Sequence, residues 1–192
     1  DAGTKESIRG PVAPNGIYEV KIAMGDFMDT KTFEVRTYPD VGADDKEIGE
    51  QFGFLIKIRD KLSEIHRAIN DIRYLKNQIG NWTGKNIEDS DISTRADGLI
   101  EELDSIEKML IQTKFKSPLD RVKYPARLNY QLGELGIVVG SADCKPTEQS
   151  YEVYDHLCKK IDRELQRLIL LRGSGLHEIN ELINSKKLPS IQ

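Results

Sequence analysis

The sequence predicts a mainly α-helical protein: an antiparallel four-helix bundle with a small β-hairpin at its N-terminal side. Residues 54–79 contain neither Gly nor Pro, and their apolar residues recur every three or four positions, as in a long amphipathic helix. The same spacing returns in three later segments, whereas the first 40 residues include stretches that alternate between apolar and polar types. We therefore expect a hairpin unit at 1–40 and a helical bundle at 41–192.

The hairpin is predicted from two alternating segments, 17–24 and 32–37, on either side of a turn at 25–29. This alternation is typical of strands with one buried face. A lone hairpin is only marginally stable in water, so it must pack on the bundle, pair with another chain or belong to a larger sheet. We favour the third interpretation, in which the hairpin is the end of a β-sandwich whose earlier strands lie upstream.

The first helix should begin near Asp44 or Asp45, either of which can cap it, and should end near Ile79. Its apolar stripe consists of Leu55, Ile58, Leu62, Ile65, Ile69, Ile72, Leu75 and Ile79. A break is expected at 80–84, which contains two glycines. Trp82 falls in that break, where it could anchor a partner or cover the end of the bundle.

Three further helices follow from the same reasoning. The second is predicted over 91–113, and the third should have Pro125 as its first residue, where proline is tolerated. The fourth should start at 146–147 and be kinked or briefly broken at 173–175. The connections are no longer than about ten residues, which favours antiparallel neighbours.

Three glycines, Gly133, Gly136 and Gly140, lie on one side of the third predicted helix. Each costs about 1 kcal/mol in a helix interior, so some compensation is expected. The favoured explanation is the close approach of a neighbouring helix. The alternative is a ligand that approaches the bare backbone.

Composition and cysteine spacing limit the partners of the chain. The net charge of −4 offers no general attraction for nucleic acid, and no apolar run approaches the roughly 20 residues of a membrane span. Cys144 and Cys158 should lie roughly 18 Å apart along the fourth helix. A disulfide needs Cα atoms within about 7 Å, so two free thiols are expected.

No motif in the sequence indicates catalysis, a metal or a cofactor. The second and fourth helices are rich in carboxylates, yet none of the three histidines follows a Glu at the spacing of a di-metal bundle site. The patterns of hydrolase triads, dinucleotide-binding turns and phosphate loops are also missing. We therefore expect the carboxylates to form solvated helix faces, and we assign no catalytic, metal or cofactor residue.

One polar line on the first helix is a candidate binding element. Arg59, His66 and Arg73 are spaced by seven residues and share one side of the helix. They could form a basic groove for an anion or a partner. The favoured interpretation is a helix flank whose cations pair with acids on the second or fourth helix.

Three stretches together carry a resemblance to a known family: 10–20 with 33–35, 51–63 with 72–73, and 124–129 running on to 141–143 and 146–147. In this order they resemble the C-terminal region of large secreted bacterial β-propeller proteins with BNR or sortilin-like repeats. Those proteins are often labelled glycosyl hydrolases. The likeness covers nearly the whole chain, and one departure is Asn15, at a turn where the family usually has Pro-Gly.

The resemblance implies that a propeller lies upstream and that any glycosidase activity of the parent resides there. It also implies that the hairpin is the remnant of an Ig-like, FlgD-type sandwich, and that the protein is secreted or periplasmic. No catalytic residue can be transferred, because the family's propeller is not part of this chain.

The expected function is that of a non-catalytic C-terminal accessory or interaction module. Its expected partners are the upstream propeller and β-sandwich, with self-association through the hairpin edge as a further expectation. Two alternatives stay open. The chain could be part of a glycosidase that contributes to its cleft, or a ligand-sensing bundle that uses Arg59, His66 and Arg73.

Overall fold

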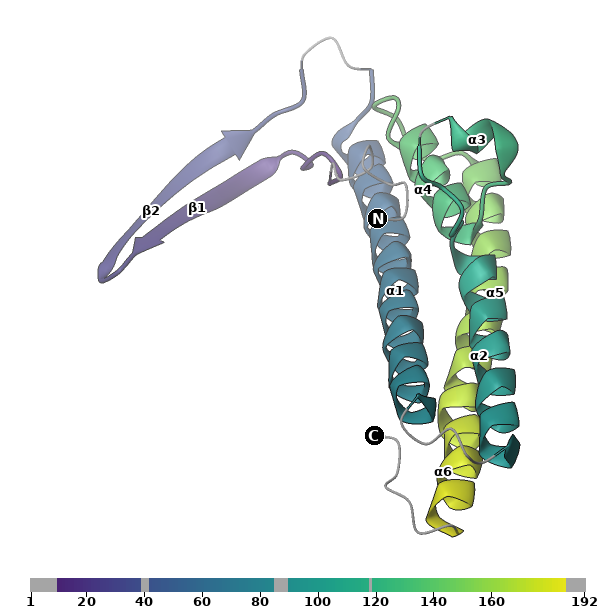
Figure 1. Cartoon of the computed structure of the whole chain (residues 1–192). Coiled ribbons are helices and arrows are strands. Elements are labelled where there is room, and N and C mark those ends of the chain that lie inside the picture. Colours follow the sequence, from purple (N-terminus) through teal and green to yellow (C-terminus); the bar gives the residue numbers. More distant parts are fainter. Residues whose placement is uncertain (1–9, 39–41, 85–89, 118, 186–192) are drawn as a thin grey trace.

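The computed structural model describes residues 10–38, 42–84, 90–117 and 119–185. The described chain is mainly helical and carries one antiparallel hairpin, which confirms the coarse prediction (Figure 1). Its elements are β1 (Gly16–Met24), β2 (Phe27–Val35), α1 (Asp45–Thr83), α2 (Ser90–Leu110), α3 (Asp120–Lys123), α4 (Leu128–Val139), α5 (Glu148–Leu170), the π-helical turn η2 (Leu171–Gly175) and α6 (Leu176–Ser185). None of the described helices is long and apolar enough to cross a membrane.

The hairpin turn is tighter than predicted. Met24 pairs with Phe27, so only Gly25 and Asp26 form the turn, and residues 27–29 belong to β2 instead of the predicted loop. Gly25 has φ +58°, a left-handed conformation that glycine adopts without the cost of a Cβ. Two-residue hairpin turns require such positive φ values, which explains the early start of β2.

Helix α1 begins as predicted and ends later than predicted. Asp44 is the N-cap, and its side chain accepts a hydrogen bond from the Glu47 backbone N–H. The helix continues through Gly80 to Thr83, so Trp82 lies in its last turn and not in a loop. Trp82 is buried within the apolar core, and this burial offsets the cost of one glycine in the helix.

The region between α2 and α4 differs from its prediction. Helix α2 ends at Leu110 rather than near Thr113, and α4 begins at Leu128, so Pro125 is not its first residue. The Pro125 carbonyl accepts a hydrogen bond from the Gln112 side chain, 3.0 Å away. This bond ties the segment before α4 to the end of α2, whereas the proline pattern by itself indicated an earlier helix start.

The predicted kink or break at 173–175 falls in a π-helical turn over Leu171–Gly175, so the winding of the helix changes there without a break. Thr147 caps α5 and accepts a hydrogen bond from the Ser150 backbone N–H. The helix then passes through the π-helical turn η2 into α6. A Cβ at Gly175 would lie 3.1 Å from Cδ1 of Leu99, so α2 closely approaches the chain at this turn.

One apolar core joins the helices. Helix α1 contacts α2, α4 and α5, while α2 also contacts α5 and α6. The side chains that are essentially inaccessible to solvent come from all of these helices: Ile65, Ile72, Ile79, Ile92, Leu103, Ile106, Leu110, Leu132, Ile161, Ile179 and Ile183. The predicted apolar stripes therefore face this core, although Leu55 and Leu62 on α1 are only partly buried.

Two of the three predicted glycines lie against α1: Gly136 in α4 and Gly140, the residue that follows α4. A Cβ at Gly136 would lie 3.4 Å from Cγ2 of Ile58, and one at Gly140 would contact Leu55. Close helix approach is thus confirmed at these two positions. The prediction is wrong for Gly133, where an added Cβ would meet no atom within 4 Å.

Candidate interaction surface

The two faces of the hairpin differ sharply in chemistry. Residues that oppose each other across the strands lie on the same face of a sheet, and neighbours along a strand alternate between faces. The register therefore gathers one largely apolar face, which we call the apolar face: Tyr18, Val20, Ile22 and Met24 of β1, with Phe27, Asp29, Lys31, Phe33 and Val35 of β2. The opposite face is more polar: Ile17, Glu19, Lys21 and Ala23, with Met28, Thr30, Thr32 and Glu34.

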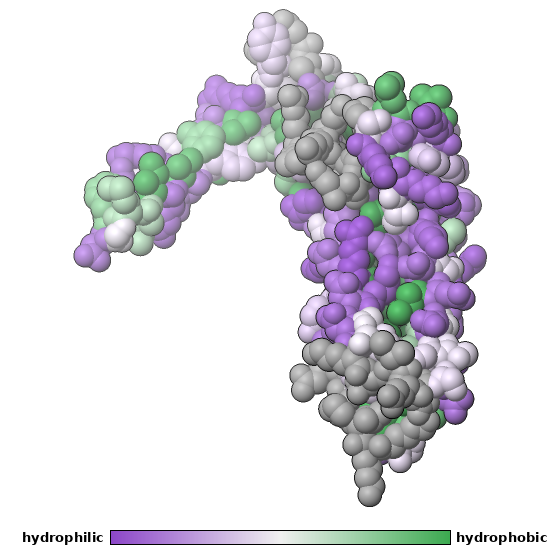
Figure 2. All heavy atoms as spheres, in the orientation of Figure 1, coloured by the Kyte–Doolittle hydropathy of each residue, from purple (hydrophilic) through white to green (hydrophobic). Residues whose placement is uncertain are grey.

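The apolar face is exposed to solvent. Ile22 keeps 60% of its accessible surface, Met24 75% and Phe27 59%. Figure 1 shows the hairpin projecting away from the helices, and Figure 2 shows hydrophobic residues along it. The predicted alternation is present, but among the described residues nothing buries the face that it creates.

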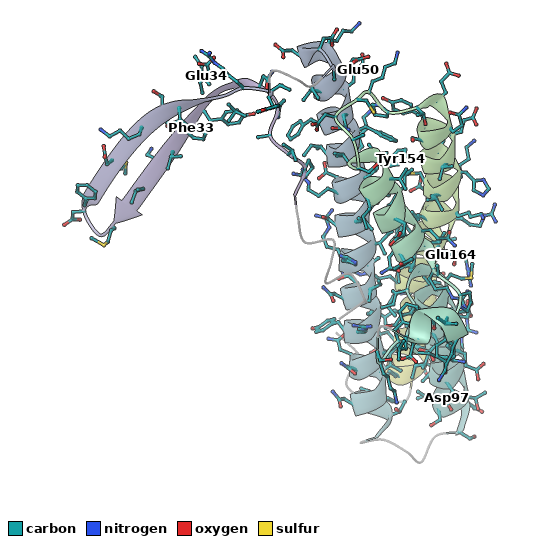
Figure 3. All side chains as sticks on the ribbon, turned by 90° about the horizontal axis from the view of Figure 1, so that it is seen from above. Phe33, Glu34, Glu50, Asp97, Tyr154 and Glu164 are labelled. Atoms are coloured by element: carbon teal, nitrogen blue, oxygen red, sulfur yellow. The ribbon has the colours of Figure 1, made fainter. Side chains whose placement is uncertain are left out.

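The base of the hairpin is attached to the start of α1. The Asn15 side chain donates a hydrogen bond to Asp45, and it accepts one from the Thr37 hydroxyl. The Tyr18 hydroxyl donates to the Pro14 carbonyl at 2.7 Å. These contacts hold both strands at the helical part, while the apolar residues near the turn extend furthest from it (Figure 3).

Both long edges of the hairpin are open. The described sheet contains only β1 and β2, so each strand has one edge that no other described strand pairs. An edge strand presents unpaired backbone N–H and C=O groups, which another strand can pair. A nine-residue strand with an open edge and an exposed apolar face is therefore suited to association with another β-structure.

Both arginines of the predicted line on α1 pair with carboxylates of this chain. Arg59 is exposed and pairs with its neighbour Asp60, whereas Arg73 pairs with Glu107 on α2 at 2.7 Å. His66 is half-buried, and its Nε2 has no hydrogen-bond partner among the described residues. Burial lowers the pKa of His66 below its ordinary value of 6.5. The two arginines thus bind carboxylates of this chain, and a ligand for the line stays a prediction.

Glu107 is the centre of a charge cluster between α1 and α2. Its side chain is only 6% exposed and accepts hydrogen bonds from Arg73 and Lys76. Lys76 also contacts Asp104, one turn earlier on α2. Burial by itself raises the pKa of Glu107, but the bonds from Lys76 and Arg73 outweigh burial and lower it. The pair between Arg73 and Glu107 confirms at this position the expectation that cations of this helix flank meet acids on the second helix. The sequence pattern did not single out Glu107 as the carboxylate that Arg73 and Lys76 share.

Other titratable groups also pair between helices. Lys61 on α1 bonds to Asp162 on α5, and Arg172 of η2 pairs with Asp71 of α1. Arg95 on α2 contacts Glu178 on α6. Within the described residues, no group of three or more His, Cys, Asp or Glu side chains could hold a metal ion.

The cysteines are both free, as predicted. Cys144 is exposed and Cys158 is half-buried. Burial raises the pKa of the Cys158 thiol, which disfavours its reactive thiolate form.

Comparisons of the chain with protein-family models, with curated proteins and with solved structures found no match. The resemblance to propeller proteins therefore stays a prediction that rests on the sequence stretches described above.

Proposed function

We propose that this chain is a non-catalytic interaction module in which the hairpin is the contact element and the helices form its support. The observation that carries the proposal is the exposed apolar face of β1 and β2. Burying one Val, Ile or Phe side chain is worth about 1.5–3 kcal/mol, so covering several of them drives association. A second β-sheet is the natural cover, because sheets pack face to face about 10 Å apart.

In this proposal the helical part is an antiparallel four-helix bundle that acts as a rigid body. Support comes from the single apolar core and from the ion pairs that join α1 to α2 and α5. A rigid support limits the conformational entropy that the hairpin loses when it docks.

The partner sheet implied by the resemblance is the β-sandwich of a secreted or periplasmic propeller protein. The hairpin would then be the last strands of an Ig-like sandwich, and residues 1–40 and 41–192 would be separate units. This form of the proposal agrees with the strand pattern and with the exposure of the apolar face.

Hydrogen exchange tests the contact role of the hairpin. In a dilute, monomeric sample, backbone amides of residues 16–35 should exchange rapidly, while the core positions of α1 and α5 should be strongly protected. A hairpin that is strongly protected in the monomer would not need a partner, and that result would refute the proposal.

The non-catalytic part has a separate test. The chain should release no sugar from a panel of α- and β-linked aryl glycosides at concentrations where a glycosidase standard is active. Hydrolysis above the buffer rate, lost on heat denaturation, would favour the alternative that the chain contributes to a glycosidase cleft.

The ligand-sensing alternative has weaker support, because Arg59 and Arg73 already pair with Asp60 and Glu107. If it holds, the Arg59→Ala and Arg73→Ala variants should each weaken binding of small anions such as phosphate. Unchanged anion binding in both variants would eliminate it.

A further inference from the structure

We propose that the outer edge of β2 pairs antiparallel with β2 of a second copy of this chain, with Thr30 opposite Thr30, to form a four-stranded sheet. This inference rests on the proposed role of the hairpin as a contact element. It concerns the strand edge, whereas the function proposed above concerns the apolar face. The two surfaces can be occupied together, because a two-fold axis perpendicular to the sheet keeps both apolar faces on one side.

The register of the hairpin shows which backbone groups of β2 point outward. The two-residue turn makes Met24 and Phe27 a hydrogen-bonded pair, and such pairs alternate with non-bonded ones along the ladder. The even-numbered residues of β2, from 28 to 34, therefore direct their N–H and C=O groups away from β1. The hydrogen bond of the Thr30 N–H agrees with this assignment, because it goes to the Asp29 side chain, at 2.9 Å, and not to a carbonyl of β1.

The side chains of β2 complement a second β2 in this register. With Thr30 opposite Thr30, Asp29 of each copy faces Lys31 of the other, and Phe27 faces Phe33. Opposite charges and aromatic pairs across strands are both stabilising. Shifting the centre of the pair by one residue would place Lys31 opposite Lys31 or Asp29 opposite Asp29, and like charges would repel each other.

In the single chain, the charged groups at this edge satisfy one another. Lys31 and Asp29 form a weak contact of 3.9 Å along the strand, and both are exposed. In the pair, the Thr30 N–H would bond to the opposite backbone carbonyl, and Asp29 would turn to Lys31 of the second copy. Pairing thus exchanges local contacts for a ladder and sets Asp29 of each copy beside Lys31 of the other.

The outer edge of β2 is favoured over that of β1 for a steric reason. A β1 pair centred on Val20 would also be complementary, because it sets Glu19 opposite Lys21. Figure 1, however, draws β1 on the side of the hairpin that faces the helical part and β2 on the outer side. A second hairpin beside β1 would enter the angle between hairpin and helices, whereas one beside β2 extends away from them.

Cysteine crosslinking tests the register directly. In a Cys144→Ser background, the Thr30→Cys variant should form a disulfide-linked dimer under mild oxidation, since facing Cα atoms of a hydrogen-bonded pair lie about 5.5 Å apart. The matched control is Thr32→Cys, on the same strand and the same face. Its two copies would lie roughly 13 Å out of step along the strands, so it should stay monomeric on denaturing gels.

Charge reversal tests the same pair without crosslinking. By analytical ultracentrifugation, Asp29→Lys or Lys31→Asp alone should weaken dimerisation by about tenfold or more, because each creates two like-charge pairs. The double variant Asp29→Lys with Lys31→Asp should restore dimerisation to within about threefold of the original. Matching circular dichroism spectra would confirm that all variants fold.

Three results would overturn the inference. These are a chain that is monomeric at every concentration, equal crosslinking of the two cysteine variants, and a dimer whose dissociation constant neither charge reversal changes. Pairing with a different β-protein instead of a second copy would appear as the first of these. The proposed function fails by a different result, namely a protected hairpin in the dilute monomer, so the two failures are distinguishable.

Discussion

Tyr18 and Phe33 stack across the base of the hairpin, with ring centroids 5.9 Å apart and ring planes 28° from parallel. They are directly opposed in the register of β1 and β2, and both belong to the apolar face. Since Tyr18 also bonds to the Pro14 carbonyl, this pair joins the hairpin to the segment that leads to it. The stacked pair and this hydrogen bond therefore help to order the open end of the hairpin, opposite its turn.

The Phe33→Ala variant should loosen the hairpin without unfolding the helices. Loss of a stacked aromatic pair removes about 0.5–1.5 kcal/mol of cross-strand interaction. The measurement is hydrogen exchange of residues 16–35, which should quicken several-fold while α1 is unaffected. Thr32→Ala on the opposite face is the matched control and should have little effect. Equal acceleration in both variants would mean that the aromatic pair is not the stabilising contact.

The Glu107→Gln variant should lower the free energy of unfolding by about 1–2 kcal/mol, because it removes the shared carboxylate of Arg73 and Lys76 from a buried position. Urea denaturation measures the loss. The exposed Glu101 on the same helix provides the control, and Glu101→Gln should change stability by less than about 0.5 kcal/mol. A Glu107→Gln variant as stable as the original would show that the pairing only compensates for desolvation.

Lowering the pH should destabilise the fold in two separate pH ranges, one set by His66 and one by Glu107. The pKa of His66 is lowered by burial, so the unfolded chain binds the proton more readily, and stability falls as the pH drops below 6.5 toward the folded pKa. The pKa of Glu107 is also lowered, so its contribution is complete above about 4.5 and is lost at lower pH. Denaturation midpoints measured from pH 7.5 to 5 should fall for the original chain and stay flatter for His66→Gln. The exposed His156 is the control, and a curve unchanged by His66→Gln would refute the assignment.

Two glycines should respond oppositely to alanine. Gly133 lies inside α4, and an added methyl group would meet no atom within 4 Å, so Gly133→Ala should raise stability by about 0.5–1 kcal/mol. At Gly175, the added Cβ would lie 3.1 Å from Cδ1 of Leu99, and this buried side chain would have to move within the core, so Gly175→Ala should lower stability. Thermal denaturation measures both. The reverse order would contradict the packing described for α2 and η2.

The helical part was predictable where local pattern determines structure. The apolar period located α1, α2, α4 and α5, and Asp44 was correctly chosen as one of two candidate caps. Helix ends were less predictable. Leu128 rather than Pro125 begins α4, and the segment before it is bonded to Gln112, thirteen positions earlier, a contact that local pattern does not encode.

The sequence predicted only part of the candidate interaction surface. Alternation in β1 showed which residues share a face, but it could not show that the face is left uncovered in this chain. The line of Arg59, His66 and Arg73 was visible in the sequence, whereas the engagement of Arg73 by Glu107 depends on how α1 and α2 align.

The sequence by itself determined the main helices and strands, the apolar side of each helix and the two faces of the hairpin, because these depend on spacings of two to four residues. Only the tertiary structure decided what each of those faces meets. In the tertiary structure the apolar sides of the helices are buried in one core, Glu107 lies between two cations, and the apolar face of the hairpin is exposed. The physical reason is that local periodicity encodes which side of an element is apolar, while its cover comes from residues distant in sequence or from another molecule.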